Sequence, residues 1–305
     1  MEESSSNTRF SGLKRIYETQ YKKLLIIPMG LVVLALILIF AKVAATGDFI
    51  NRDVSLKGGV TITVPSQSNV DTEAMAQFLN SKFPSNDVSI KSLTQFGTAS
   101  GFIVESDLSQ EQANALIDAI GEFLGKELGS RDYALEIIGE SLGASFFREL
   151  MVALLVAFVF MSIVVFILFR NIVPSIAVIL AVVSDIIVTL AVVNLLGVKI
   201  STAGIAAFLM LIGYSVDTDI LLTSRVLKRK EGTEMERVYS ALNTGLKMTT
   251  TAVLAITAGL LITQSPIIKE ILLILLIGLL ADTIFTWIQN VALLRWYLEK
   301  KRGPQ

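Results

Sequence analysis

The chain contains no cysteine and no histidine among its 305 residues. The lack of cysteine excludes disulfide bonds and thiol chemistry, and the lack of histidine excludes imidazole ligands for a metal ion. Any proton-transferring chain must then consist of Asp, Glu, Lys, Arg or Tyr side chains together with water. There is also no glycine-rich phosphate-binding loop. We therefore expect no cofactor, no metal ion and no direct use of a nucleotide.

Charge of either sign is scarce as well, because the formal net charge is −1 and charged residues make up 17% of the chain. This balance gives no electrostatic reason to expect a nucleic-acid partner. Apolar residues make up 53%, and the mean hydropathy is +0.66. These values are typical of a polytopic protein that sits in membrane lipid rather than of a soluble one.

Six apolar stretches are long enough to cross a bilayer as helices. They are residues 24–45, 147–169, 172–196, 200–222, 241–262 and 267–294. The first is longer than a typical signal-peptide core and follows a polar segment, which favours an uncleaved anchor over a cleaved signal. The predicted fold class is therefore a polytopic α-helical membrane protein with six transmembrane helices, five of them within 145–295.

Basic residues gather on one side of the membrane if the six stretches alternate in direction. That side holds Arg9, Lys14, Arg15, Lys22, Lys23, Arg170, Arg225, Lys228, Arg229, Lys230, Arg237, Arg295, Lys300, Lys301 and Arg302. The loops on the opposite side contain Lys199 and Lys269. We predict cytoplasmic tails at 1–23 and 296–305, and an extracytoplasmic segment at 46–144, in the cell membrane.

The inserted segment 46–144 alternates between strand and helix patterns. Strands are predicted at 60–64, 88–93, 102–104 and 133–138, and helices at 71–82 and 109–128. The order βαββαβ is that of an α+β ferredoxin-like sheet. Glu105 and Asp107 flank a predicted turn, and we interpret them as solvated loop carboxylates. Nothing in the segment has catalytic spacing, so it is expected to bind a partner or act as a lever.

Asp185 stands in the middle of the third apolar stretch. It lies about 13 residues, or roughly 20 Å, from the predicted cytoplasmic end, which is near the bilayer midplane. Thr189 follows at i+4 on the same helix face. A carboxylate in hydrocarbon costs about 2.5–3.5 kcal/mol, so we interpret Asp185 as a functional residue.

The fourth stretch contains two further aspartates. Asp217 and Arg225 are eight residues apart and share a helix face, while Asp219 points about 200° round the helix from Asp217. We interpret Asp217 as ion-responsive and Asp219 as the more structural of the two. Gly213 offers a small surface where another helix can approach closely.

Asp282 lies inside the sixth stretch and is followed by Thr286, Gln289 and Asn290. Four intramembrane aspartates then face few bases, namely Arg225 and, if it reaches back, Lys247. They cannot all be ionised and paired in a low dielectric, so at least one holds a proton or a cation. This imbalance predicts proton or sodium coupling. The alternatives are aspartates that only hold helices together, and an Arg225 that merely extends to the membrane surface.

The motifs that carry this pattern resemble the SecF proteins of the SecD/SecF family. Residues 213–222 followed by Arg225 look like the fourth-span signature, and 185–189 match the third-span motif. Residues 139–143 resemble the start of the second span, and Gly58 and Gly59 the turn that opens the external domain. The resemblance covers nearly the whole chain.

Two departures place the chain nearer the archaeal branch of that family. Asp217-Thr218-Asp219 stands where the bacterial pattern has Asn-Asp-Ser, and Ser55-Leu56 replaces the usual Asp-Phe before the glycine pair. Because the acidic position has moved, residues of the bacterial fourth span do not transfer one for one. Asp185 and Arg225 transfer best.

The resemblance implies a non-enzymatic accessory subunit of the Sec protein-export machinery. Such a subunit pairs with SecD, resembles half of a resistance-nodulation-division transporter, and uses the proton or sodium gradient to draw exported polypeptide through the SecYE channel. The ion-coupling candidates on this chain are Asp185, Asp217, Arg225 and Asp282. The supporting residues are Asp219, Thr189, Gly213 and Thr218, and Gly58 and Gly59 form the turn of the external domain.

Three other functions remain open from the sequence. A small-molecule or lipid exporter of the same superfamily usually has two halves of six spans, and this chain has one. A purely structural scaffold of the translocon would use its aspartates as contacts between helices. An intramembrane aspartyl protease would need Tyr-Asp and Gly-x-Gly-Asp motifs, which are absent.

Overall fold

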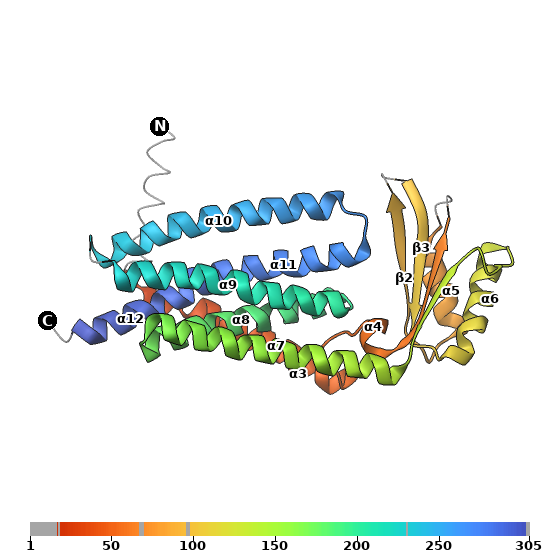
Figure 1. The fold of residues 1–305 in the computed structure, drawn as a ribbon, viewed down its shortest axis with the longest axis horizontal. Coiled ribbons are helices and arrows are strands. Elements are labelled where there is room, and N and C mark those ends of the chain that lie inside the picture. The colour runs from red at the N-terminus through yellow and green to blue at the C-terminus, as the bar shows by residue number, and fades with distance from the viewer. Residues whose placement is uncertain (1–16, 18, 67–69, 96–97, 230, 303–305) are drawn as a thin grey trace.

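The computed structural model describes residues 17, 19–66, 70–95, 98–229 and 231–302. Within these residues six helical segments are long and apolar enough to cross a membrane, as predicted. Figure 1 shows them packed lengthwise into one bundle, with a small sheet domain at one end. They are α3 (Ile26–Thr46), α7 (Glu140–Phe169), α8 (Ile172–Leu195), α9 (Thr202–Lys228), α10 (Glu234–Ile262) and the run formed by α11 (Pro266–Ile284), a π-helical turn (Phe285–Asn290) and α12 (Val291–Arg302).

Two short helices complete the helical part, α2 (Tyr21–Leu24) before α3 and α4 (Val54–Lys57) after it. Helix α12 continues through most of the segment expected as the C-terminal tail. Arg9, Lys14, Arg15 and Lys230, which contribute to the predicted orientation, lie outside the described residues.

A capping side chain fixes the start of each of the helices α9, α10 and α11. The Ser201 hydroxyl accepts hydrogen bonds from the first backbone N–H groups of α9. Thr233 and Glu236 form a capping box at α10, and Ser265 caps α11 just before Pro266. The capping box explains why α10 begins at Glu234, seven residues before the apolar stretch that marks it in the sequence.

The bundle has a central and a peripheral set of helices. Half of the most apolar window of α8, α9 and the α11–α12 run is buried in the protein, against 11% for α3 and α7 and 17% for α10. The peripheral helices instead expose large apolar side chains, such as Leu261 with 81% of its surface accessible. Apolar residues on the outside of a bundle are what contact with lipid tails requires.

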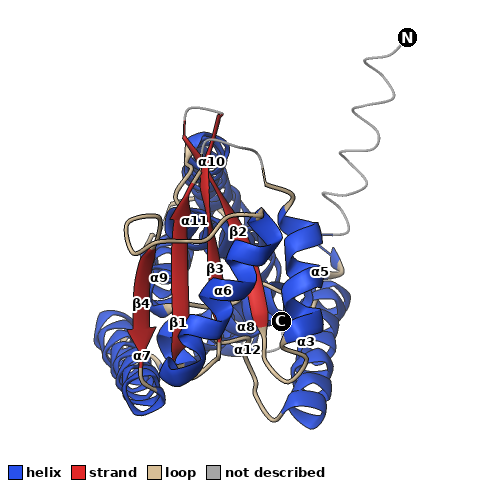
Figure 2. Ribbon diagram, turned by 90° about the vertical axis from the view of Figure 1, so that its right-hand side faces the viewer, coloured by secondary structure: helices blue, strands red, loops and turns tan. Residues whose placement is uncertain are grey.

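The inserted domain (residues 59–138) has the predicted βαββαβ order. It consists of β1 (Gly59–Pro65), α5 (Thr72–Lys82), β2 (Val88–Gln95), β3 (Thr98–Ser106), α6 (Ala113–Leu124) and β4 (Ala134–Ile138). The strands are antiparallel in the spatial order β2-β3-β1-β4. Figure 2 shows α5 and α6 on one face of the sheet, while its other face is turned toward the bundle. This confirms the ferredoxin-like prediction.

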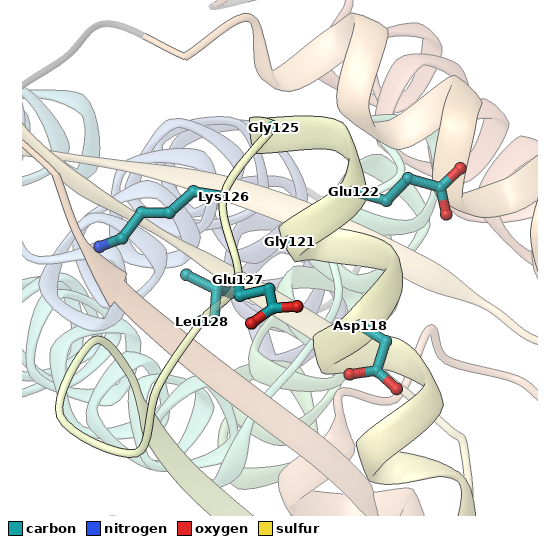
Figure 3. Close-up of a pocket in the computed structure, with 7 residues that line it drawn as sticks. All are labelled: Asp118, Gly121, Glu122, Gly125, Lys126, Glu127 and Leu128. Atoms are coloured by element: carbon teal, nitrogen blue, oxygen red, sulfur yellow. The ribbon is translucent and has the colours of Figure 1, made fainter.

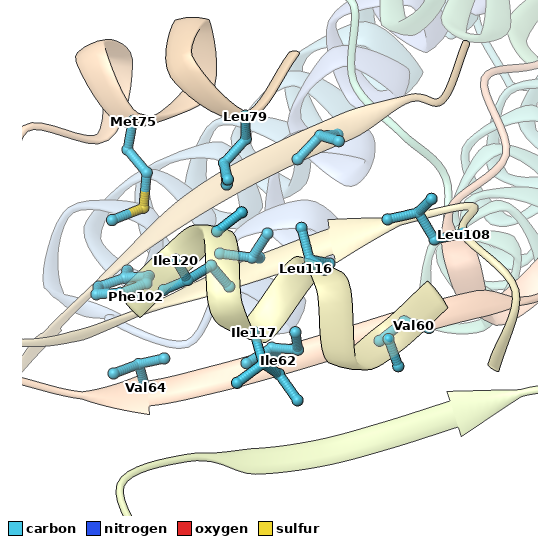
Figure 4. Packing of buried hydrophobic residues seen from close by; sticks show 14 residues of the cluster. Val60, Ile62, Val64, Met75, Leu79, Phe102, Leu108, Leu116, Ile117 and Ile120 are labelled. Atoms are coloured by element: carbon cyan, nitrogen blue, oxygen red, sulfur yellow. The ribbon is translucent and has the colours of Figure 1, made fainter. Parts of the chain in front are cut away.

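The core of the inserted domain lies between the sheet and its two helices. Val60 and Ile62 of β1 point inward at alternate positions and meet Leu116 of α6 and Leu79 of α5, all with no accessible surface (Figure 4). Burial of each such side chain contributes about 1.5–3 kcal/mol. The domain therefore has its own hydrophobic core and does not depend on the bundle for one.

Two sequence-based boundaries of this domain need correction. The second helix was expected to run to residue 128, but it ends at Leu124 because Gly125 adopts a left-handed conformation with φ of 65°. Strand β3 extends from Thr98 to Ser106, well beyond the expected 102–104. The apolar residues 102–104 indicated only the centre of the strand, and the prediction left out its more polar ends.

The interpretation of Glu105 as a solvated loop carboxylate is wrong. Glu105 lies within β3, retains 7% of its accessible surface, and pairs with Lys91 of β2 at 2.7 Å. Burial and the neighbouring Asp53 raise the pKa of Glu105 above its ordinary value, although Lys91 opposes the shift. Asp107 does follow the strand, where its carboxylate accepts hydrogen bonds from the Asn86 amide and the Asp87 N–H.

A backbone contact joins the inserted domain to the bundle at Gly58 and Gly59. Their φ angles are 88° and 137°, in a region that side-chain-bearing residues rarely adopt. A Cβ on Gly58 would lie 2.5 Å from the Cα of Glu140, in the first turn of α7. Gly143 of α7 approaches equally closely, since its Cβ would lie 2.5 Å from the Gly58 nitrogen. The glycines let two backbones touch where the domain begins.

A Gly58→Ala variant is therefore expected to destabilise the junction by at least about 1–3 kcal/mol, the usual cost of forcing a non-glycine residue into this conformation. Gly139→Ala is the matched control, because nothing lies within 4 Å of a Cβ at Gly139 and its φ is −64°. Thermal unfolding of the two purified variants measures the difference. Equal melting temperatures would contradict the prediction.

Candidate functional site

Three aspartates from the three central helices meet inside the bundle. Asp185 of α8, Asp219 of α9 and Asp282 of α11 each have no accessible surface. Asp282 lies beside both of the others, and its charge acts on each of them. We call these three residues the carboxylate layer.

Each carboxylate of the layer has one neutral hydrogen-bond donor. The Ser215 hydroxyl donates to Asp185, the Thr286 hydroxyl donates to Asp282 Oδ1 at 2.9 Å, and the Asn290 amide donates to Asp219 Oδ1 at 2.6 Å. The second oxygen of each carboxylate has no hydrogen-bond partner among the described residues. Buried polar atoms without a partner are rare in folded proteins, and each costs about 1–3 kcal/mol.

The π-helical turn Phe285–Asn290 positions two of these donors. It begins three residues after Asp282, and its Thr286, Gln289 and Asn290 side chains are all buried. Turns of this type are frequent at functional sites. The Gln289 amide also lies 3.4 Å from the Ser184 hydroxyl, which links the turn to α8 next to Asp185.

No described lysine or arginine forms an ion pair with the layer. Arg225, the expected base, instead donates from Nη1 to the Ser240 carbonyl oxygen at 2.6 Å and to the Thr244 hydroxyl at 2.8 Å, and so joins α9 to α10. Lys247 is exposed on α10 and does not reach the layer. The charge imbalance predicted from the sequence is therefore larger in the folded chain.

The two aspartates of α9 lie on opposite sides of the helix, one buried and one exposed. Asp219, interpreted as the more structural one, belongs to the layer, whereas Asp217 is exposed on the outer face together with Gly213. Helix periodicity correctly separated Asp217 from Asp219 but did not say which one points inward. The functional role of Asp217 stays a prediction.

Of the supporting residues, Thr189 and Thr218 are buried and Gly213 is exposed. Thr189 is fully buried in α8, and its hydroxyl has no partner among the described residues. Thr218 is nearly buried and donates to the Tyr214 carbonyl oxygen at 3.2 Å. Sequence reasoning missed Ser215, the donor to Asp185. Its position four residues before Asp219 was the available signal, because that spacing places both on one helix face.

A separate cavity of about 550 Å³ opens at the end of α6 on the inserted domain. Figure 3 shows the carboxylates of Asp118, Glu122 and Glu127 pointing in different directions, with the Lys126 amine turned away from them. Its polar groups do not converge on one point. The carboxylate layer is therefore the candidate site.

A helical bundle with a buried carboxylate layer, and a ferredoxin-like domain after its first long helix, defines a multi-pass membrane protein. Residues 117–300 match the family model described as protein export membrane protein SecD/SecF, C-terminal. The chain belongs to the SecD/SecF family of protein-export membrane proteins.

Two archaeal relatives match along nearly the whole chain. It is 37% identical over 291 residues to the protein-export membrane protein SecF of Methanothermobacter thermautotrophicus, covering 92% of this chain and 93% of that protein. It is 36% identical over 293 residues to that of Pyrococcus furiosus, covering 96% of each.

The solved structures support the same fold. The crystal structure of SecDF, a translocon-associated membrane protein from Thermus thermophilus, matches with a TM-score of 0.70 at 23% identity over 92% of this chain. A super-membrane-facing form of SecDF matches with a TM-score of 0.53 over 90% of this chain. This chain spans 38% of the length of each SecDF chain.

Proposed function

We propose that the chain promotes protein export as a SecF-type subunit acting with a SecD partner and the SecYE channel, and that Asp185, Asp219 and Asp282 bind the ion whose gradient drives it. One observation carries this proposal: three buried carboxylates each have an oxygen without a partner. Even the lenient insertion scale sets about 2.5–3.5 kcal/mol for each charge at this depth. A proton or a cation on the layer removes much of that cost.

The chemistry of the layer suits a small, hard cation or a proton. Its groups are carboxylates, the Ser215 and Thr286 hydroxyls and the Asn290 amide. Oxygen ligands prefer hard cations to soft ones, and carboxylates in contact share protons readily. Ion binding and release would therefore change both the charge and the packing between α8, α9 and α11.

The outer face of α9 supports the proposed SecD partner. Asp217 lies about 15 residues along this 27-residue helix, or roughly 22 Å from its start, yet it is exposed beside Gly213, Tyr214 and Met210. A carboxylate facing lipid tails near the midplane is unfavourable, whereas a partner helix with a polar group there would accommodate it. The small Gly213 would allow that helix to approach closely.

An Asp217→Asn variant is expected to bind SecD more weakly, by about 2–5 kcal/mol if the partner places a charge against Asp217. Ion binding by the layer should be unchanged, since Asp217 is not part of it. Co-purification of SecD from lipid nanodiscs measures the first effect, with Asp118→Asn on the inserted domain as the control. Undiminished SecD binding would remove Asp217 from the interface.

We also propose that both chain termini are cytoplasmic and that the inserted domain is extracytoplasmic. The end of the bundle away from the inserted domain carries Arg229, Arg237 and Lys300, as the positive-inside rule expects. Protease accessibility in sealed vesicles of known orientation tests this placement.

The proposed function is tested by export into sealed vesicles that contain this chain, SecD and the SecYE channel. A proton gradient or a sodium gradient is imposed separately, and each is then collapsed with a selective ionophore. Stimulation by one gradient supports ion-coupled export and identifies the ion. Equal export with and without either gradient would favour a structural scaffold, and transport of a small molecule or lipid instead would favour an exporter.

A further inference from the structure

Each of the three helices that form the carboxylate layer has one of its two ends next to the inserted domain. The loop after α8 contains Lys199, whose Nζ lies 2.7 Å from Asp87 Oδ2 just before β2. Helix α9 begins after Ser201, and Glu270 is the fifth residue of α11. The helices that would respond to an ion therefore all reach the same few residues.

Glu270 clamps the starts of α9 and α11 together. Its Oε1 accepts a hydrogen bond from the Ser201 N–H at 2.7 Å, and its Oε2 accepts one from the Ser201 hydroxyl at 2.8 Å. Gly204 leaves room for this carboxylate, because a Cβ on Gly204 would collide with Glu270 Oε1. A movement of α11 along its axis must then carry the start of α9 with it.

Backbone hydrogen bonds and an ion pair of Asp53 connect this contact to the inserted domain. The Ile200 N–H donates to the Asn51 carbonyl oxygen at 2.6 Å, and the Asp53 N–H donates to the Ile200 carbonyl oxygen at 3.0 Å. The Asp53 carboxylate lies 3.6 Å from the Lys91 amine, which also contacts Glu105 at 2.7 Å. Lys91 thus joins the bundle side of this contact to the sheet.

Lys91 provides the positive charge that pairs with the carboxylates of this contact. Asp53 and Glu105 are buried, and the charge of Glu270 acts on Lys91. Burial lowers the pKa of Lys91, but Asp53 and Glu105 outweigh it, so that the pKa is raised and the amine stays charged. Without this amine, two buried carboxylates would lose their counter-charge, which is the costly way to break a buried pair.

There is space beside the contact for the domain to tilt. A cleft of about 610 Å³ separates β2 from the outer ends of α10 and α11. Its walls include Ser92, Lys199, Leu260 and Lys269. On the other side, the glycine pair Gly58 and Gly59 attaches β1 to α7 without side chains. If the domain pivots at Gly58 and Gly59, the ionic contact of Lys91 on its other side would make it move together with the ends of α9 and α11.

We propose that Lys91 and Glu270 are positioning residues of an ionic strap, formed with Asp53, Glu105 and Ser201, which makes the inserted domain move when the carboxylate layer binds or releases its ion. This inference rests on the proposed function of the layer. Glu270 is about 12 residues from Asp282 on the same helix, or roughly 18 Å. A shift or tilt of α11 at Asp282 therefore reaches Glu270 through continuous helix and passes to Lys91 through Ser201 and Asp53.

The test uses the full chain with two introduced cysteines, Glu127→Cys on the inserted domain and Leu261→Cys on α10. The chain has no cysteine of its own, so spin labels attach at these two exposed positions. The distance between the labels is measured in phosphatidylcholine nanodiscs at two pH values and with or without sodium. Ion binding by the layer is measured by calorimetry on the same samples.

In the wild type, ion binding should change the distance between the two labels by more than about 2 Å, the size of a clear rearrangement. Lys91→Met should bind the ion with unchanged affinity but abolish the distance change, and Lys91→Arg should restore it. Lys82→Met is the matched control, because Lys82 pairs with Glu122 inside the inserted domain, away from the bundle. Glu270→Gln is the second variant if Lys91→Met fails to fold, with the same expected loss.

A distance change in Lys91→Met or Glu270→Gln equal to that of the wild type would overturn the strap and leave the proposed function standing. Absence of ion binding in the wild type would overturn the proposed function, and the coupling with it. The two failures are distinguishable because the first is seen in the label distance and the second in the binding isotherm.

Discussion

An Asp219→Asn variant is expected to lose the response of protein export to the ion gradient while it still folds and inserts. The asparagine carbonyl oxygen can keep the hydrogen bond from the Asn290 amide that Asp219 Oδ1 accepts in the wild type. What disappears is the negative charge, together with the oxygen that lacks a partner. We expect gradient-dependent stimulation to fall by about tenfold or more, which corresponds to about 1.4 kcal/mol.

The control for this variant lies two residues away on the same helix. Asp217→Asn makes the same chemical change on the exposed face, so it should leave ion binding by the isolated chain intact. Calorimetric ion binding by the isolated chain should be compared for the two variants at equal amounts of protein, and export with and without the gradient should be measured for Asp219→Asn against the wild type. If Asp217→Asn abolishes ion binding and Asp219→Asn does not, the ion site lies on the outer face of α9 and the proposed layer is wrong.

The burial of Asp219 rather than Asp217 has a physical cause. In a soluble helix the apolar face marks the interior, but a membrane helix is apolar on the side that faces lipid as well as on the side that faces protein. The small polar residues mark the interior instead. Ser215, Asp219 and Thr223 recur at four-residue spacing and all three are buried, whereas the residues four before and four after Asp217 are Gly213 and Leu221. That polar stripe was readable in the sequence.

The membrane helices themselves were predictable because bilayer thickness sets a minimum apolar length. Their ends were less so, since a capping box such as Thr233 with Glu236 can begin a helix in polar sequence. The π-helical turn was not predictable, because Phe285–Asn290 has no composition that distinguishes it from ordinary helix. Glu105 was misjudged for a different reason: its burial depends on Lys91 in another strand and Asp53 outside the sheet.

An Asp282→Asn variant is expected to unfold at a higher temperature than the wild type, although it removes a member of the layer. Asp282 Oδ2 and Asp185 Oδ1 both lack hydrogen-bond partners, and the two carboxyl groups are neighbours. An asparagine amide at 282 can donate to the Asp185 carboxylate, while its carbonyl oxygen keeps the bond from the Thr286 hydroxyl. Removing one desolvated charge and satisfying one acceptor should stabilise the fold by about 1–3 kcal/mol.

Thermal unfolding in lipid nanodiscs measures this gain, and tryptophan fluorescence is a suitable signal because Trp287 lies in the adjoining π-helical turn. Asn290→Asp is the opposite control, since it adds a fourth carboxylate next to Asp219 and should lower the melting temperature. A melting temperature of Asp282→Asn below that of the wild type would mean that Asp282 is needed to hold the helices together, as in the scaffold alternative. Greater stability combined with lost ion binding would mean that the chain retains an unfavourable charge because ion coupling requires it, the usual relation between stability and function at such sites.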